Sequence, residues 1–184
     1  MSVNRVELEP AYILHARAYR ETSQILEVFT PGHGRLTLVA KGARRPKSPL
    51  RGILNPFQSL RLSWSGRGEM QTLREAELTG PVTDTHHSAV LSCFYINELI
   101  LKLLERSDPH PDLFAHYNSL LNDIKTGQPV EPLLRVFELR LLSEIGYEPN
   151  FTEEADTGLT VEDDGLYEFV ADFGIVRSGR DPDQ

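Results

Sequence analysis

Positively charged side chains in the N-terminal third of the chain could bind a polyanion. No Asp or Glu lies between Glu27 and Glu69. The segment between them carries these cations: Arg35, Lys41, Arg44, Arg45, Lys47, Arg51, Arg61 and Arg67. Its centre, Val39–Gly52, also contains Gly and Pro, which interrupt helices and strands and favour a loop. Because each phosphate neutralised by Lys or Arg releases counterions, nucleic acid is a natural partner, and a solvated basic loop is the alternative.

The charge is divided unevenly along a chain whose formal net charge is -8. Residues 1–80 carry 12 Lys and Arg against 7 Asp and Glu, which gives +5. Residues 81–184 carry 7 against 20, which gives -13. This asymmetry predicts two functional halves, one basic and one acidic.

Other patterns that could carry out chemistry are weak. The histidines lack the helical pair with an intervening glutamate that is typical of a zinc site, and the single cysteine, Cys93, excludes a cysteine cluster or an intrachain disulfide. No nucleophile elbow or phosphate-binding glycine loop is present. The acidic residues Glu162–Asp164 do not have EF-hand spacing. We therefore predict no catalytic residue, no metal site and no cofactor, with Cys93 as a buried, unreactive thiol.

The elements that must position the basic segment are predicted to be short strands. Ile25–Phe29 and Leu36–Leu38 flank a PGHG turn and are predicted to form a hairpin, whereas His15–Ser23 is predicted to be a polar, exposed stretch. After Pro56 the side chains alternate, and a second glycine-rich turn precedes a strand at Met70–Leu78. This pattern favours a small barrel, and among small barrels the OB-fold commonly binds single-stranded nucleic acid.

Aromatic rings on such a barrel could stack on bases, but most rings in a small barrel belong to its core. The candidates are Tyr19, Phe29, Phe57 and Trp64.

Beyond Gly80 and Pro81 the apolar residues recur with a helical period. Three amphipathic helices are predicted, around Val90–Leu104, Leu113–Ile124 and Leu134–Ile145, and the first is predicted to be buried on most sides. After an acidic segment, Leu166–Val176 is predicted to form a strand pair around Asp172.

The predicted fold class is therefore α+β. An OB-fold β-barrel at 1–80 precedes a helical bundle at 81–151, and an acidic segment at 152–184 contains a small β-hairpin and a frayed tail. The N-terminus has neither the basic start nor the long apolar core of a signal peptide, and no apolar run approaches the ~18 residues of a membrane span. These features predict a cytoplasmic location.

Several segments in a fixed order resemble the bacterial RecO family of recombination mediators. They include AYILHARAYRETSQILEVFT (11–30), HGRLTLVAKGARRPKSPLRG (33–52), NPFQSL (55–60), SGRGEMQTLREAE (65–77), YINELILKLLE (95–105) and RVFELRLLSEIGYEPNF (135–151). The resemblance covers about residues 8–151. The chain differs from the family in two respects. It lacks the four-cysteine zinc site of some members, and it is shortened relative to members with further C-terminal helices. If those helices complete the bundle, exposed apolar surface and weaker stability are expected.

The resemblance implies a protein that binds single- and double-stranded DNA, anneals strands coated with single-strand binding protein (SSB), and acts with RecR to help load RecA. It implies association with the nucleoid. It implies DNA contacts at the basic positions Arg35, Lys41, Arg44, Arg45, Lys47 and Arg51. It also implies that Arg135 helps to bind the acidic, apolar C-terminal tail of SSB.

A second hypothesis is a protein–protein adaptor that uses its acidic helical half and does not bind DNA directly. A nuclease is a distant third. Charge reversal of the basic loop separates the first two hypotheses, and cleavage of DNA with Mg²⁺ or Mn²⁺ would support the third.

Overall fold

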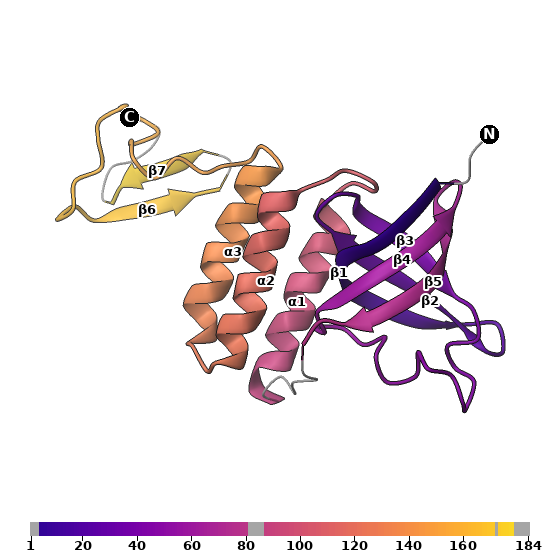
Figure 1. The fold of residues 1–184 in the computed structure, drawn as a ribbon. Helices are drawn as coiled ribbons and strands as arrows, with labels where there is room; N and C mark the ends of the chain where they lie inside the picture. The colour runs from indigo at the N-terminus through magenta and orange to yellow at the C-terminus, as the bar shows by residue number, and fades with distance from the viewer. Residues whose placement is uncertain (1–3, 81–86, 172, 179–184) are drawn as a thin grey trace. The chain divides into compact units, whose positions relative to one another are not determined.

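A computed structural model describes residues 4–80, 87–171 and 173–178 of the chain (Figure 1). The chain divides into two compact units, residues 1–140 and residues 141–184. The first contains a five-stranded barrel followed by helices, and the second contains a small two-stranded sheet. The predicted α+β class, with its barrel, helices and C-terminal hairpin, is confirmed.

The barrel has the strand order and closure of an OB-fold. Its strands are β1 (Asn4–Tyr19), β2 (Ser23–Thr30), β3 (Gly34–Ala40), β4 (Leu60–Gly66) and β5 (Met70–Leu78). They close in the order β1-β2-β3-β5-β4, and the β3–β5 pair is parallel while the other pairs are antiparallel. The predicted hairpin is the β2–β3 pair, in which Thr30 lies opposite Gly34.

Strand β1 is longer than the sequence predicted, and the prediction of a polar connection over His15–Ser23 was wrong. The N-terminal part of β1 pairs with β4 and its C-terminal part pairs with β2, so one strand closes the barrel. Register shifts between Val6 and Glu9 and between Ile13 and His15 interrupt the two ladders. Such bulges bend a strand, which lets β1 follow the barrel wall. The polar residues after Leu14 sit in a strand because one face of it is solvated.

Alternating apolar side chains fill the barrel interior. Leu26 and Val28 of β2 meet Leu36 and Leu38 of β3 inside the barrel. On β4, Leu60, Leu62 and Trp64 are buried, whereas Arg61 is exposed, as the alternation predicted.

Three helices follow the barrel: α1 (His87–Leu103), α2 (Pro111–Lys125) and α3 (Val130–Glu144). The prediction that the first is buried on most sides was wrong, because Leu91 is 79% exposed and Tyr95 is 41% exposed. On α2 the apolar residues that recur with the predicted helical period are buried, including Leu113 and Tyr117. Helix α3 ends in paired hydrogen bonds in which Gly146 N donates to Ser143 O and Tyr147 N to Leu142 O. The positive φ of 82° at Gly146 allows this ending.

Within the first unit, α1 and α2 cover the outer surface of β1 and β2. The ring of Phe29 lies 5.4 Å from that of Phe114 and 6.2 Å from that of Tyr117, measured between centroids. A buried polar chain joins the same elements: Tyr117 Oη donates to Asn97 Oδ1 at 2.6 Å, and Asn97 Nδ2 donates to Leu14 O at 2.8 Å. Aromatic packing and satisfied hydrogen bonds therefore attach the helices firmly to the barrel.

The second unit contains the predicted strand pair, formed by β6 (Tyr167–Val170) and β7 (Gly174–Arg177). Asp172, around which the pair was predicted to turn, lies outside the described residues. In the preceding acidic segment, Glu162 Oε2 accepts a hydrogen bond from Arg177 Nη2 at 2.8 Å.

Candidate nucleic-acid interface

The basic loop, residues 41–59 between β3 and β4, is a series of tight turns. Backbone hydrogen bonds run from Arg45 N to Gly42 O, from Ser48 N to Arg45 O and from Arg51 N to Ser48 O. Gly42 adopts a φ of 71°, a left-handed conformation that favours glycine. A loop built of consecutive turns holds its side chains in a restricted set of positions, so its cations are partly preorganised.

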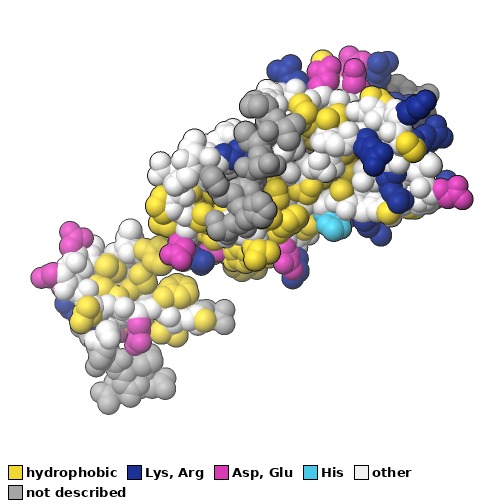
Figure 2. Space-filling view, turned by 90° about the horizontal axis from the view of Figure 1, so that it is seen from below, with side chains coloured by type: hydrophobic (Ala, Val, Ile, Leu, Met, Phe, Trp, Pro, Cys, Tyr) yellow, Lys and Arg dark blue, Asp and Glu magenta, His cyan; other side chains and the backbone are white. Residues whose placement is uncertain are grey.

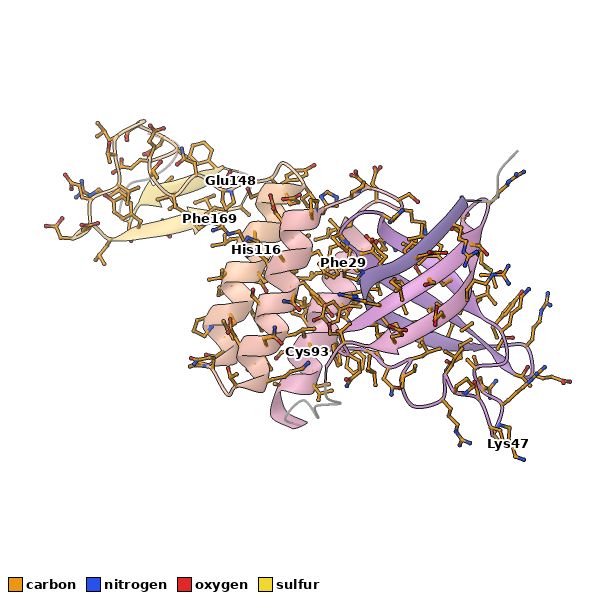
Figure 3. All side chains as sticks on the ribbon, viewed as in Figure 1. Phe29, Lys47, Cys93, His116, Glu148 and Phe169 are labelled. Carbon is orange, nitrogen blue, oxygen red and sulfur yellow. The ribbon has the colours of Figure 1, made fainter. Side chains whose placement is uncertain are left out.

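Apolar residues anchor this loop to the barrel. Ala43 and Leu54 are buried within the barrel core, and Leu50 and Ile53 pack against it. The cations of the loop are all exposed: Lys41, Arg44, Arg45, Lys47 and Arg51. Figure 3 shows Lys47 directed away from the barrel, and Figure 2 shows Lys and Arg side chains gathered over the barrel. The structure thus brings five of the six predicted DNA-contact residues onto one exposed loop.

Arg44 connects the basic loop to the turn between β1 and β2. Its backbone N donates to Thr22 O at 2.9 Å, and its Nη1 lies 3.4 Å from both Arg20 O and Glu21 O. In that turn the guanidinium of Arg20 lies 5.1 Å from the centre of the Tyr19 ring. The first barrel turn therefore contributes a cation and an aromatic ring beside the basic loop.

A groove of about 660 Å³ separates the basic loop from β5. Its lining includes the cations Lys41, Arg45 and Lys47 from the loop, and Arg74 and Glu75 from β5. The sequence prediction did not include Arg74 among the DNA contacts, although the residue lies in one of the family-like segments. The parallel pairing of β3 with β5 places Arg74 near Lys41, and such non-local pairing is not visible in the hydrophobic pattern.

Arg35, the sixth predicted DNA contact, is placed apart from the basic loop. It lies at the start of β3, and at about 3.3 Å per residue it is roughly 20 Å along the strand from Lys41. Its backbone O accepts a hydrogen bond from Ser107 N at 2.9 Å in the α1–α2 connection. Burial, together with the nearby guanidinium of Arg106, lowers the pKa of Arg35. Arg35 is therefore packed under the connection and is not part of the loop surface.

Gly34, the residue before Arg35, also shows how closely the α1–α2 connection approaches the barrel. A Cβ atom added at Gly34, whose φ is 61°, would lie 1.9 Å from Asp108 O. Only glycine fits at this position.

The barrel rings proposed for base stacking are mostly buried, as expected for rings of a small barrel. Phe29, Phe57 and Trp64 are 0%, 7% and 1% exposed, respectively. Tyr19 is only partly buried, and as the last residue of β1 it lies next to the turn that contacts the basic loop. Of these four candidates, Tyr19 is the ring that remains accessible to a base.

Arg135, the predicted contact for the tail of SSB, lies on α3 and is 69% exposed at its side chain. Its Nη1 pairs with Glu138 Oε2 at 2.5 Å. Tyr95 of α1 donates to the other oxygen of Glu138 at 2.7 Å, and this hydrogen bond raises the pKa of Tyr95. The guanidinium of Arg135 is thus already partly neutralised.

A second groove, of about 240 Å³, lies between α2 and α3. Leu120, Val136 and Phe137 supply apolar lining, and the polar or charged groups are His116, Asp123 and Arg140. Arg135 does not line this groove, because it lies on the side of α3 that contacts α1. Helix α3 therefore offers two arginines in different surroundings.

The comparisons with known proteins cover both halves of the chain. The N-terminal model of recombination protein O matches residues 3–82, and the C-terminal model of the same protein matches residues 87–182. This chain belongs to the RecO family. The family resemblance drawn from the ordered sequence segments is confirmed.

Several curated relatives in this family bear the name DNA repair protein RecO. The one from Ralstonia nicotianae is 48% identical over 95% of this chain and 64% of its own length. Those from Nitrosospira multiformis and Azoarcus sp. strain BH72 are 44% and 45% identical, over 95% and 92% of this chain and 72% and 70% of their own lengths. The chain thus spans about two thirds of the length of these RecO relatives.

In this RecO-family chain, the described residues contain no group of three His, Cys, Asp or Glu side chains that could hold a metal ion. Cys93 of α1 is fully buried, and burial raises the pKa of its thiol to about 11. The prediction that Cys93 is a buried thiol is confirmed.

Within the described ranges, no helix is both long and apolar enough to cross a membrane.

Proposed function

We propose that the chain is a DNA-binding recombination mediator that brings complementary single strands together. The basic loop and the groove beside β5 hold the phosphates of one strand by ionic contacts. Pairing with a second strand then needs no bond chemistry from the protein, because local concentration is raised. The RecO-family membership supports a role in DNA repair, and the partners SSB, RecR and RecA follow from that membership as proposals.

The observation that carries the proposal is the exposed, core-anchored basic loop. Five cations project from a loop whose apolar residues are fixed in the barrel core. With about 4–6 phosphate contacts, the affinity for DNA falls steeply and linearly on a log–log plot against salt. A flat salt response would contradict this use of the loop.

The helical part of the chain is proposed to dock the C-terminal tail of SSB, an acidic and apolar ligand. Arg135 was assigned to this tail by resemblance, and its pairing with Glu138 means that a tail carboxylate would have to displace or share that partner. The α2–α3 groove offers apolar lining beside Arg140 and is a second candidate for such a tail, with Asp123 as an opposing charge in the same lining. The two arginines can be separated by substitution.

The test is annealing of complementary oligonucleotides precoated with SSB, using intact SSB and SSB without its C-terminal tail. Stimulation only with the intact tail is the expected result. Arg135→Ala and Arg140→Ala variants, which both remove an exposed arginine of α3, serve as matched controls for each other. Loss of stimulation in one variant identifies the docking cation, and stimulation that does not depend on the tail would overturn the docking proposal.

A further inference from the structure

A β-bulge in β5 directs a cation toward the groove beside the basic loop. Ser63 lies opposite Glu75 and Trp64 lies opposite Leu73, so Arg74 is the extra residue of the strand. Neighbouring residues of a regular strand point to opposite faces, but here Arg74 and Glu75 are both exposed. Bulges often occur beside functional sites because they change where a side chain points.

The guanidinium of Arg74 is held in place by the neighbouring strand. Its Nε donates to Oγ of Ser65 on β4 at 2.7 Å, and Ser65 itself is buried. This hydrogen bond restrains the guanidinium plane, whose remaining N–H groups have the fork geometry that suits a phosphate. Ser65 is therefore a positioning residue for Arg74.

The groove has an excess of positive charge. Lys41, Arg45, Lys47 and Arg74 contribute four positive charges to its lining, and Glu75 contributes one negative charge, a net of +3. In the described part of the chain, none of these four cations forms an ion pair with a carboxylate. A cluster of cations without acidic partners is favourable when a polyanion supplies the missing charge.

We propose that Arg74 is a direct contact for the sugar–phosphate backbone, and that one DNA strand runs in the groove between the basic loop and β5. Glu75 lines the same groove, so its carboxylate repels the phosphates and limits the affinity. A strand held with limited affinity can leave the groove when it pairs with its complement. This inference rests on the proposed DNA-binding function and names the second wall of its site.

The first test measures binding of a fluorescent single-stranded oligonucleotide to the full chain over a series of salt concentrations. Arg74→Ala should weaken binding about eightfold near about 50 mM salt and reduce the log–log salt slope by about 0.7, the values for one lost phosphate contact. Arg74→Lys should keep most of the slope, because it keeps the charge. The control is Lys102→Ala, which removes an exposed cation of α1 that does not line the groove and should leave affinity and slope unchanged.

The second test uses a substitution with the opposite expected sign. Glu75→Gln should strengthen binding about threefold at low salt, because a repulsive charge is removed from the groove. Glu77→Gln is the matched control, since Glu77 lies two residues further on the same strand, opposite Arg61, and does not line the groove. Equal effects of the two substitutions would mean that only net charge matters, and would overturn the assigned path.

These outcomes separate the inference from the function on which it rests. The inference is wrong if Arg74→Ala has the salt slope of the unaltered protein while DNA binding still needs Arg44, Arg45 and Lys47. In that case the strand does not contact β5. If the unaltered protein does not bind the oligonucleotide, the proposed function itself is wrong. Thermal unfolding of each variant shows whether a loss reflects folding.

Discussion

The two sides of the barrel in this chain differ in what covers them. The outer surface of β1 and β2 is covered by α1 and α2, with Phe29 between the rings of Phe114 and Tyr117. The surface at the basic loop and β5 is open instead, and Lys41 and Arg74 are exposed there beside a groove. In OB-folds the surface of strands 2 and 3 is a common site for oligonucleotides. Here the protein's own helices cover much of that surface, which supports the proposal that a basic loop and a neighbouring strand supply the DNA site.

The largest effect is expected from a substitution on the covered side. Phe29→Ala removes a ring that is fully buried between the barrel and α2, and should lower the free energy of unfolding by about 3–5 kcal/mol. DNA affinity of the folded variant should change little, because the ring does not reach the groove. Urea unfolding and oligonucleotide binding measure the two effects. Met70→Ala, at an exposed residue of the barrel, is the control, and equal losses of stability in both variants would contradict the comparison.

Charge reversal on the exposed side should have the converse result. Changing Arg44, Arg45 and Lys47 together to Glu should weaken DNA binding about 100-fold or more at low salt, because attractive phosphate contacts become repulsive. The unfolding midpoint should stay close to that of the unaltered protein, since all three side chains are exposed. Binding to a peptide of the SSB tail should also persist. DNA binding that survives the three substitutions would favour the protein–protein adaptor hypothesis.

The smallest expected effect is on the reactivity and titration of Cys93, which lies on the helix-covered side. Burial raises the pKa of its thiol to about 11. At pH 8 only about one thiol in a thousand is then ionised, so a thiol reagent should label the native protein far more slowly than the unfolded protein. Because the unfolded thiol ionises near pH ~8.5, this group contributes stability that is complete below that pH and is lost as the pH rises toward 11.

The Cys93 prediction can be checked by the rate of labelling and by unfolding at increasing pH. Cys93→Ala lacks this titration, so the difference in stability between the two proteins should narrow above pH ~8.5. Rapid labelling of the folded protein at pH 8 would mean that the helix-covered side opens readily.

Some features of the chain were fixed by local sequence. Alternation of Leu60, Arg61 and Leu62 sets one residue toward solvent and two into the core, because side chains of a strand point alternately to its two faces. Helical spacing identified the buried residues of α2, and Gly146 ends α3 because it can adopt a positive φ. The run of cations identified the loop, since Gly and Pro exclude regular structure there.

Other features depended on contacts between distant segments. The sequence pattern could not separate Arg35 from the basic loop, because its burial depends on the α1–α2 connection crossing β3. Arg74 could not be assigned to the groove, because the parallel β3–β5 pairing and the bulge in β5 arise only when the barrel closes.

The sequence by itself therefore determined most of the elements other than β1, the family and the position of the positive charge. Only the tertiary structure decided which cations share a groove, which rings are buried and which side of the barrel is covered. The physical reason is that periodicity and turn residues act over a few positions, whereas burial and pairing are set by segments that are far apart along the chain.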